Sequence, residues 1–143
     1  MCASLAVAAG KPDFSGEWTL DAARSALGPF SPSYSLKRVV THREPKLTIV
    51  ESQGGGPGDS DSTRIYSTDG TVSMNTFMAI PVQCTAVWAG DSLVITINAD
   101  VEGFPFRRID QWTLSSDGKT LTSIINVHGG DGDFEFTYVM KKK

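Results

Sequence analysis

Two charged residues, Arg108 and Asp110, are the side chains best placed for ligand chemistry. They alternate with Phe106, Trp112 and Leu114 in one run, and alternate side chains of a β-strand share a face, so all five are expected on the same side. An arginine on such a face either pairs with the neighbouring carboxylate or binds a ligand anion through parallel hydrogen bonds. We therefore select Arg108 as the candidate ligand-orienting residue. A structural ion pair, or an outward position on the solvent face, is the alternative.

The histidines and cysteines offer little metal or catalytic chemistry. His42 and His128 are the two imidazoles, and neither has a histidine or cysteine nearby in the sequence, whereas a zinc site needs three or four clustered ligands. His128 is kept as a candidate axial ligand for haem iron, with a solvated position beside Gly129 as the alternative. Cys84 lies in an apolar run and is expected to be a small buried hydrophobe. No metal site and no cofactor is predicted.

Motifs typical of enzyme active sites are missing from the sequence. It contains no nucleophile elbow, no recognisable Ser–His–Asp order and no specific pair of carboxylates. Serine and aspartate are abundant because they favour turns. A binding protein is therefore predicted rather than an enzyme, with an isomerase or cyclase that merely confines its substrate as the alternative.

Length and charge limit the remaining possibilities. The chain has 143 residues, enough for one domain to bury a core without metal or disulfide staples. Its formal net charge is −3 and its basic run is the terminal Lys141–Lys143, so no nucleic-acid partner is expected. No segment approaches the ~20 apolar residues that a membrane-spanning helix needs. One globular domain is predicted over residues 12–143.

The first eleven residues differ in composition from the rest. They are mostly small and apolar and include Ala6-Val7-Ala8, an A-x-A pattern of the kind found at signal-peptidase sites. Residues 1–11 are therefore predicted to be a disordered leader or the remnant of a signal peptide. The corresponding expectation is a periplasmic or secreted protein.

Turn residues divide the chain after Pro12 into short β-branched and aromatic runs, which is typical of an all-β meander. Asp69-Gly70 marks a tight hairpin, because its glycine tolerates a positive φ. One short helix of about two turns is predicted over Asp21–Leu27, between a capping aspartate and Gly28-Pro29. The predicted strands are Phe14–Leu20, Ser35–Thr41, Leu47–Ser52, Thr63–Thr68, Thr71–Ala79, Gln83–Trp88, Ser92–Asp100, Phe106–Leu114, Lys119–His128 and Phe134–Met140.

Consecutive strands of this number are expected to close on themselves, since closure removes exposed strand edges. Alternation gives each strand one buried face, as in Leu93, Ile95 and Ile97. The predicted fold is a closed antiparallel up-and-down β-barrel of about 8–10 strands, with one short helix after the first strand. Two stacked sheets are the alternative.

The run Phe14–Leu20 carries a family motif. Its sequence, FSGEWTL, resembles the F-x-G-x-W-x-L signature on the first strand of lipocalins and fatty-acid-binding proteins, the calycin group. Phe14, Gly16 and Trp18 occupy the motif positions. The resemblance implies that the tryptophan closes one end of a barrel, that the glycine permits close approach of neighbouring chain, and that a central cavity takes an apolar ligand.

Further resemblances refine this expectation. Pro12–Trp18 and Trp112–Leu121 resemble segments of small exported bacterial proteins described as lipocalin-like. Fatty-acid-binding proteins carry an inward arginine near the place of Arg108, and an Arg-x-Tyr clamp for the ligand carboxylate on the last strand. Here Phe136-Thr137-Tyr138 keeps the tyrosine of that clamp and replaces its arginine by an apolar ring.

The predicted function is to bind or carry a small hydrophobic ligand in a cavity of a few hundred cubic ångströms, in a monomer or weak dimer. One alternative is a haem-binding barrel resembling nitrobindins, with His128 as axial ligand. Another is a structural or partner-binding barrel without a ligand. The predicted ligand-binding residues are Phe77, Trp88, Leu93, Ile95, Ile97, Phe106, Arg108, Trp112, Phe134, Phe136 and Tyr138.

Overall fold

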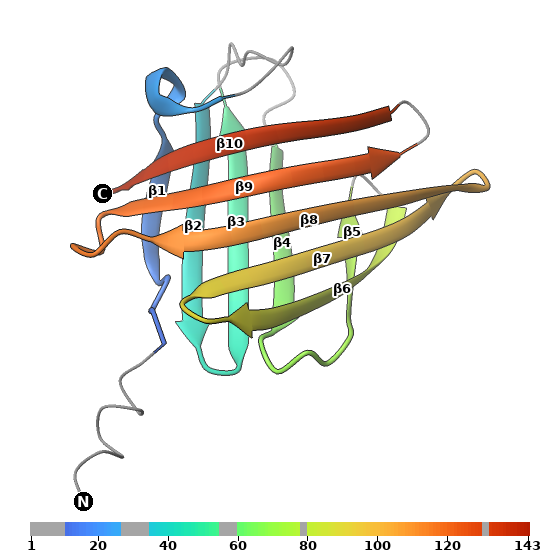
Figure 1. Cartoon of the computed structure of the whole chain (residues 1–143), viewed down its shortest axis with the longest axis horizontal. Coiled ribbons are helices and arrows are strands. Elements are labelled where there is room, and N and C mark those ends of the chain that lie inside the picture. Colours follow the sequence, from blue (N-terminus) through green and yellow to red (C-terminus); the bar gives the residue numbers. More distant parts are fainter. Residues whose placement is uncertain (1–10, 27–34, 55–59, 78–79, 130–131) are drawn as a thin grey trace, which may run out of the picture.

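A ten-stranded antiparallel sheet makes up most of the described structure. The computed structural model describes residues 11–26, 35–54, 60–77, 80–129 and 132–143. Hydrogen-bonded neighbours follow the order β4-β3-β2-β1-β10-β9-β8-β7-β6-β5, which confirms the predicted all-β up-and-down barrel (Figure 1). The strands are β1 (Gly16–Leu20), β2 (Ser35–Arg43), β3 (Lys46–Gly54), β4 (Ser60–Ser67), β5 (Ser73–Phe77), β6 (Ile80–Ala89), β7 (Ser92–Val101), β8 (Phe104–Leu114), β9 (Thr120–Gly129) and β10 (Gly132–Lys142).

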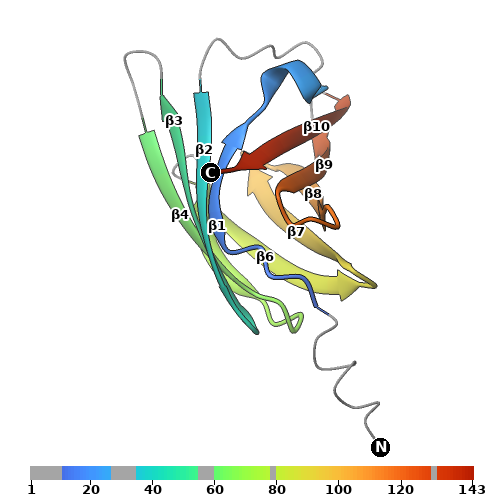
Figure 2. The same ribbon diagram turned by 90° about the vertical axis from the view of Figure 1, so that its left-hand side faces the viewer.

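The strand connections define two ends of the barrel. Because successive strands run in opposite directions, the turns β2–β3, β4–β5, β6–β7 and β8–β9 gather at one end, called the base here. The last residues of β1, β3, β5, β7 and β9 lie at the other end, called the mouth. Strands β1 to β4 lie on one side, and β6 to β10 cross them steeply on the other (Figures 1 and 2).

The barrel closes at the seam between β4 and β5 through a side chain instead of a backbone ladder. The Nδ2 atom of Asn75 on β5 donates a hydrogen bond to the carbonyl oxygen of Ile65 on β4, at 3.0 Å. The Oδ1 atom of Asn75 accepts from the Ile65 backbone N–H at 2.9 Å. The side-chain amide of Asn75 thus replaces a pair of backbone hydrogen bonds between β4 and β5. The predicted closed barrel is therefore nearly closed, with this seam as the gap in the backbone hydrogen bonding.

The segment after β1 is less helical than predicted. A two-turn helix over Asp21–Leu27 was expected, but the structure has one 3₁₀ turn, η1 (Ala22–Arg24), and Leu27 lies outside the described residues. The reason is that this segment bonds to β10: the Asp21 N–H donates to the Val139 carbonyl at 2.8 Å, and Ala26 pairs with Thr137. Within the described residues, no helix has the length and hydropathy needed to cross a membrane.

The base is packed around the motif residues at and just before the start of β1. Phe14 and Trp18 are at most 1% exposed, and the Trp18 Nε1–H donates to the Phe14 carbonyl at 3.0 Å. Gly16 has a φ of +144°, and a Cβ built there would lie 2.8 Å from the Cε atom of Lys142. The tryptophan plugs the barrel end and the glycine allows the close approach, as the motif implied.

Candidate ligand-binding site

The predicted cavity residues separate into two levels. Leu93, Ile95, Ile97 and Trp112 face inward and are at most 2% exposed, so they are core residues toward the base. The inward aromatic residues nearer the mouth are only half-buried, and the rings of two of them stack with centroids 6.4 Å apart. The apolar side chains that retain exposed surface among these predicted residues therefore lie nearer the mouth. These half-buried residues are Phe106, Phe134, Phe136 and Tyr138.

Two of the predicted lining residues, Trp88 and Phe77, cannot be assigned to the cavity wall. Trp88 lies at the base, where its ring stacks on those of Phe14 and His42 with both centroids 5.9 Å away. We therefore assign Trp88 to the closure of the base and not to the cavity wall. Phe77 belongs to β5, but its side chain lies outside the described residues.

His42 is a structural part of the base. Its Nδ1 accepts a hydrogen bond from the Phe14 N–H at 3.2 Å, and its Nε2 bonds the Oε2 of Glu44. The same carboxylate accepts from the Thr68 hydroxyl at 2.7 Å and from the Trp88 Nε1–H at 2.9 Å. Burial raises the pKa of Glu44, but these hydrogen bonds outweigh it and lower the pKa. Both imidazole nitrogens are thus occupied, and His42 is positioned by the fold rather than offered to a substrate.

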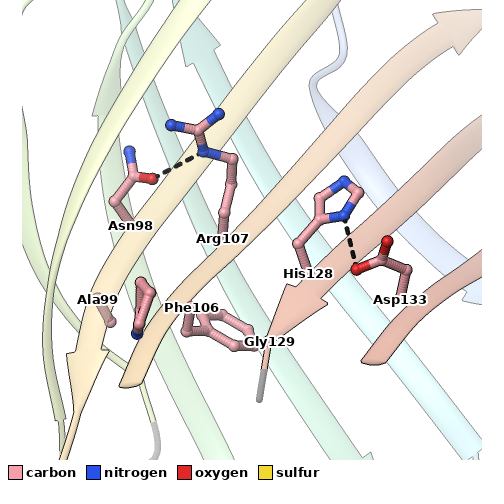
Figure 3. Close-up of a pocket in the computed structure, with 8 residues that line it drawn as sticks. Asn98, Ala99, Phe106, Arg107, His128, Gly129 and Asp133 are labelled. Carbon is pink, nitrogen blue, oxygen red and sulfur yellow. Dashed lines mark hydrogen bonds and ion pairs between the residues drawn. The ribbon is translucent and has the colours of Figure 1, made fainter. Parts of the chain in front are cut away.

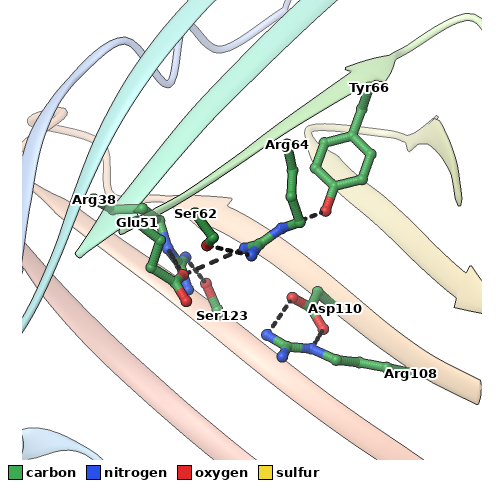
Figure 4. Close-up of polar contacts among 8 residues, drawn as sticks. All are labelled: Arg38, Glu51, Ser62, Arg64, Tyr66, Arg108, Asp110 and Ser123. Atoms are coloured by element: carbon green, nitrogen blue, oxygen red, sulfur yellow. Dashed lines mark hydrogen bonds and ion pairs between the residues drawn. The ribbon is translucent and has the colours of Figure 1, made fainter. Parts of the chain in front are cut away.

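A cluster of polar side chains, contributed by strands from both sides of the barrel, comes together in the interior (Figure 4). Sequence reasoning found only its β8 members. The others could have been found from alternation, because each shares an inward face with buried apolar residues such as Val40 or Ile49. The cluster consists of Arg38 on β2, Glu51 on β3, Ser62, Arg64 and Tyr66 on β4, Arg108 and Asp110 on β8, and Ser123 on β9.

Arg38 spans the interior from one side of the barrel to the other. Its Nε donates to the Oε2 of Glu51 at 2.9 Å, and its Nη1 donates to the Ser123 hydroxyl at 3.4 Å. Its guanidinium carbon also lies 5.2 Å from the ring centroid of Trp112, within cation–π range. The Nε1 of Trp112 is the one buried side-chain donor without a partner among the described residues.

Arg64, on β4, bonds both Glu51 of β3 and two neighbouring side chains of its own strand. Its Nη2 donates to the Oε2 of Glu51 at 3.4 Å, its Nε donates to the Tyr66 hydroxyl at 2.9 Å, and its Nη1 donates to the Ser62 hydroxyl at 3.3 Å. Burial raises the pKa of Tyr66, so the phenol is neutral at physiological pH. Glu51 is therefore shared, through one oxygen atom, by two arginines.

Arg108 and Asp110 form a two-point ion pair inside the barrel. The Nε and Nη2 atoms of Arg108 lie 2.8 and 3.0 Å from the two carboxylate oxygens of Asp110. The side chains are 13% and 7% exposed. Burial lowers the pKa of Arg108, but Asp110 outweighs this and raises it, so the guanidinium keeps its charge. The predicted inward position of Arg108 is therefore correct. The ion pair with Asp110, which was the alternative to ligand binding, is also present.

Five charged side chains belong to the described part of this cluster. Three guanidinium groups, those of Arg38, Arg64 and Arg108, face two carboxylates, those of Glu51 and Asp110. Burial raises the pKa of Glu51, but the three arginines outweigh this and lower it to about 2. Glu51 therefore keeps its negative charge at neutral pH.

Acid is expected to weaken this cluster through Glu51. Its pKa is lowered from 4.5 to about 2 by folding, so its contribution to stability is complete above pH 4.5 and is lost as the pH falls towards 2. The loss amounts to about 3 kcal/mol. Urea unfolding between pH 4.5 and 2 should show this loss of unfolding free energy in the wild-type chain. The loss should be smaller in Glu51→Gln, where only other carboxylates such as Glu44 titrate. An equal loss in both proteins would contradict the assignment.

A groove of about 610 Å³ lies at the mouth ends of β7 to β10 (Figure 3). It is built around two outward polar pairs. Arg107 Nε donates to Asn98 Oδ1 at 3.1 Å, and His128 Nδ1 lies 3.0 Å from Asp133 Oδ1. The half-buried ring of Phe106 marks its inner wall. The lining residues are Asn98, Ala99, Pro105, Phe106, Arg107, His128, Gly129 and Asp133.

The position of His128 argues against haem in the barrel. Its side chain is 48% exposed. In the strand register His128 lies opposite the exposed Arg107 of β8, and its side chain is on the sheet face opposite to that of buried Ile125. An axial ligand would have to point inward, so the predicted role of His128 is not supported by the geometry. Within the described residues, no group of three or more His, Cys, Asp or Glu side chains could hold a metal ion.

Comparison with known proteins places the fold. The sequence matches no protein-family model and no curated protein. Solved structures do match over nearly their whole length. One, the REP1-NXSQ fatty acid transporter, has a TM-score of 0.66 and 12% identity over 90% of this chain and 95% of its own. The chain has the calycin fold.

Two more calycin-fold structures show the breadth of the match. Zebrafish ileal bile acid-binding protein, solved with cholic acid, has a TM-score of 0.65 and 15% identity, covering 91% of this chain and 98% of its own. Human cRBP IV has a TM-score of 0.63 and 10% identity, covering 92% and 99%. At these identities the likeness establishes the fold alone, so the function must be argued from the interior.

Proposed function

We propose that this calycin-fold chain binds and carries a small hydrophobic ligand in the mouth half of its barrel. The observation that carries the proposal is the division of the interior. Side chains toward the base are almost fully buried, whereas the inward aromatic residues Phe106, Phe134, Phe136 and Tyr138 retain exposed surface. Apolar walls with a few placed polar groups are the usual composition of a small-molecule site.

The polar cluster would orient the ligand. Arg108 on β8 and Phe134 on β10 both lie opposite Val127 of β9, so an apolar body against the half-buried rings would bring one polar end to Arg108. Arg108 is the arginine on the same strand face as Phe106, two residues away. A guanidinium is suited to a carboxylate or a similar oxyanion because it donates parallel hydrogen bonds. Structures of the same fold include a fatty acid transporter and a protein solved with cholic acid, which supports a ligand of this kind.

The arrangement favours carriage over catalysis. Among the described interior residues, the polar contacts are ion pairs and hydrogen bonds that hold arginines, and none joins a nucleophile to a general base. His42, which could act as a base, has both ring nitrogens bonded within the base. We propose a binding protein, acting as a monomer or weak dimer without nucleic acid.

We also propose that this carrier works outside the cytoplasm, in the periplasm or after secretion. The support is the Ala6-Val7-Ala8 pattern, which belongs to the part of the chain outside the described residues. Detection of the cleaved chain in a periplasmic or culture-medium fraction of its own host would test it, and an uncleaved cytoplasmic chain would contradict it.

Native mass spectrometry of the protein purified from its own host, together with an absorption spectrum, tests the binding function. A co-purified small apolar mass is expected, and the spectrum should lack a Soret band. A Soret band would instead establish the haem alternative. Bare protein that also fails to bind apolar probes would favour a structural barrel.

Replacing Arg108 by glutamine is expected to weaken binding of dodecanoate about 10- to 100-fold, because a buried charge-assisted hydrogen bond to the ligand is lost. Arg107→Gln is the matched control, since Arg107 is the next residue on the same strand and points outward. It should change the affinity by no more than about twofold. Displacement of a neutral fluorescent probe measures both, and Arg108→Lys, which keeps the charge, should fall between them. Equal affinities for the Arg107 and Arg108 variants would remove Arg108 from the site.

A further inference from the structure

A shallow pocket of about 220 Å³ lies on the outer face of the β2–β3 hairpin, and it is called the hairpin pocket here. Its lining residues are Thr41 and Arg43 of β2 and Lys46 and Thr48 of β3. The strand register places Thr41 opposite Thr48 and Arg43 opposite Lys46, so the four side chains form two adjacent rows on one face of the sheet. Sites for drug-sized ligands have roughly 300–1,000 Å³, so this pocket suits a smaller group.

The hairpin pocket offers hydrogen-bond donors and positive charge. Arg43 contributes a guanidinium, Lys46 an ammonium group, and the two threonine hydroxyls can each donate one hydrogen bond. No carboxylate is among the described residues that line it. Donors of this kind match the oxygens of a phosphate group, to which arginine donates parallel hydrogen bonds and lysine presents a point charge.

The two cations of the pocket have no counter-charge in the described part of the chain. Neither Arg43 nor Lys46 forms an ion pair or a side-chain hydrogen bond there. They lie directly opposite each other in the ladder, and like charges at opposed positions of an antiparallel pair destabilise it. An anion bound between them would replace this repulsion by two attractions.

Two acids at the same end of the barrel are bonded to other groups. Glu44, in the turn of the hairpin, accepts hydrogen bonds from the Thr68 hydroxyl and the Trp88 Nε1–H within the base. Asp69, which follows β4, accepts from the Ser67 hydroxyl at 2.7 Å. These carboxylates are held away from the two cations, which can therefore bind an external anion.

We propose that the hairpin pocket binds a phosphate group, presented either by a free phosphate ester or by the headgroup of a lipid. Arg43 donates parallel hydrogen bonds to two phosphate oxygens and Lys46 supplies the second positive charge. The hydroxyls of Thr41 and Thr48 donate to the remaining oxygens. The pocket is on the outer face of the sheet, so this site is separate from the proposed interior site and does not depend on it.

Glycerol 3-phosphate tests the free form of the ligand. At about pH 8 it is a dianion, because the second pKa of a phosphate monoester is ~6. Titration into the ¹⁵N-labelled chain should shift the backbone amide resonances of residues 41–48, with a Kd of about 1 mM, the order expected of two or three charge-assisted hydrogen bonds on an exposed face. Potassium chloride at equal ionic strength should not reproduce these shifts.

Vesicles test the lipid form. The chain is floated with phosphatidylcholine vesicles that contain or lack phosphatidate, whose headgroup is a phosphate monoester. Binding that requires phosphatidate supports the site and identifies a lipid as its source. Binding of glycerol 3-phosphate without binding to these vesicles supports the site and identifies a free ester. Binding in neither arm overturns the proposal.

Arg43→Gln and Lys46→Gln should each weaken binding about tenfold in the arm that binds. Lys37→Gln is the matched control, because Lys37 is also an exposed cation on the outer face of β2, roughly 20 Å along the strand from Arg43. It should change the affinity by no more than about twofold. Equal losses in the Lys37 and Arg43 variants would show a general attraction of anions to the surface and would overturn the site.

Thermal unfolding gives a second measurement on the same variants. Arg43 is exposed, so Arg43→Gln is expected to fold. Without phosphate its Tm should be no lower than that of the wild-type chain, because the variant lacks the like-charge pair. Glycerol 3-phosphate should raise the Tm of the wild-type chain and not that of the variant, since a ligand stabilises only the folded state that binds it. An equal rise in both proteins would contradict the assignment.

Discussion

Replacing Arg38 by alanine is expected to lower the free energy of unfolding by about 3–5 kcal/mol, the range for removing one partner of a buried ion pair. The Arg38 side chain is 1% exposed and crosses the interior to reach Glu51 on one side and Ser123 on the other. Its loss leaves Glu51 with Arg64 as the remaining hydrogen-bonding arginine and removes the cation–π contact with Trp112. Urea unfolding at neutral pH, followed by circular dichroism, measures the change.

Arg107→Ala is the control for the Arg38 variant. Arg107 is exposed on the outer face of β8, where its side chain bonds Asn98. Exposed polar contacts of this kind contribute only about 0–1 kcal/mol. A loss in Arg38→Ala no larger than in this control would show that the interior cluster does not hold the two sides of the barrel together.

Replacing Phe14 by alanine is expected to cost about 3–5 kcal/mol, as large-to-small changes of buried aromatic residues do. Phe14 is 0% exposed. Its ring lies against those of His42, Trp88 and Trp112, with centroids 5.7, 5.9 and 5.4 Å away. Alanine would leave a void at the base and remove these ring contacts, which the surrounding strands can fill only in part.

Phe104→Ala gives the matched comparison, because this phenylalanine is 64% exposed near the mouth. Surface changes of this kind usually stay within about 0.5 kcal/mol. Both variants are measured by the same urea titration. Similar losses of unfolding free energy in the two variants would mean that the base is not tightly packed. They would also mean that Phe14 of the motif does not stabilise the fold.

Much of the fold could be predicted from local signals. Turn residues such as Asp117-Gly118 separate the strands, and alternation in Leu93, Ile95 and Ile97 identifies the inner face. The tight hairpin predicted at Asp69-Gly70 was wrong, because β4 and β5 form no ladder and the turn instead bonds β6, with Asp69 paired to Val87 and the Gly70 N–H donating to the Ala86 carbonyl. The predicted helix over Asp21–Leu27 was too long, because a tertiary partner competes for the same backbone groups: Asp21 and Ala26 bond β10. Such a partner, more than a hundred positions away in the chain, leaves no local signal.

The candidate site was less predictable than the fold. Arg108 and Asp110 are two residues apart on one strand, and their pairing follows from alternation. Arg38 meets Ser123 across 85 positions of sequence, and such a contact depends on how the sheet curls. Alternation also assigns a face but not a height along the barrel, which explains why Trp88 was expected in the cavity wall and lies at the base.

The central claim is that a ligand binds in the mouth half of the barrel. Nuclear Overhauser effects between bound dodecanoate and the protein test it most directly. We expect contacts from its methylene protons to the rings of Phe106, Phe134, Phe136 and Tyr138. Contacts confined to exposed apolar residues of the outer surface, such as Val72, Met74 and Val87, would contradict the account, as would no contacts at all.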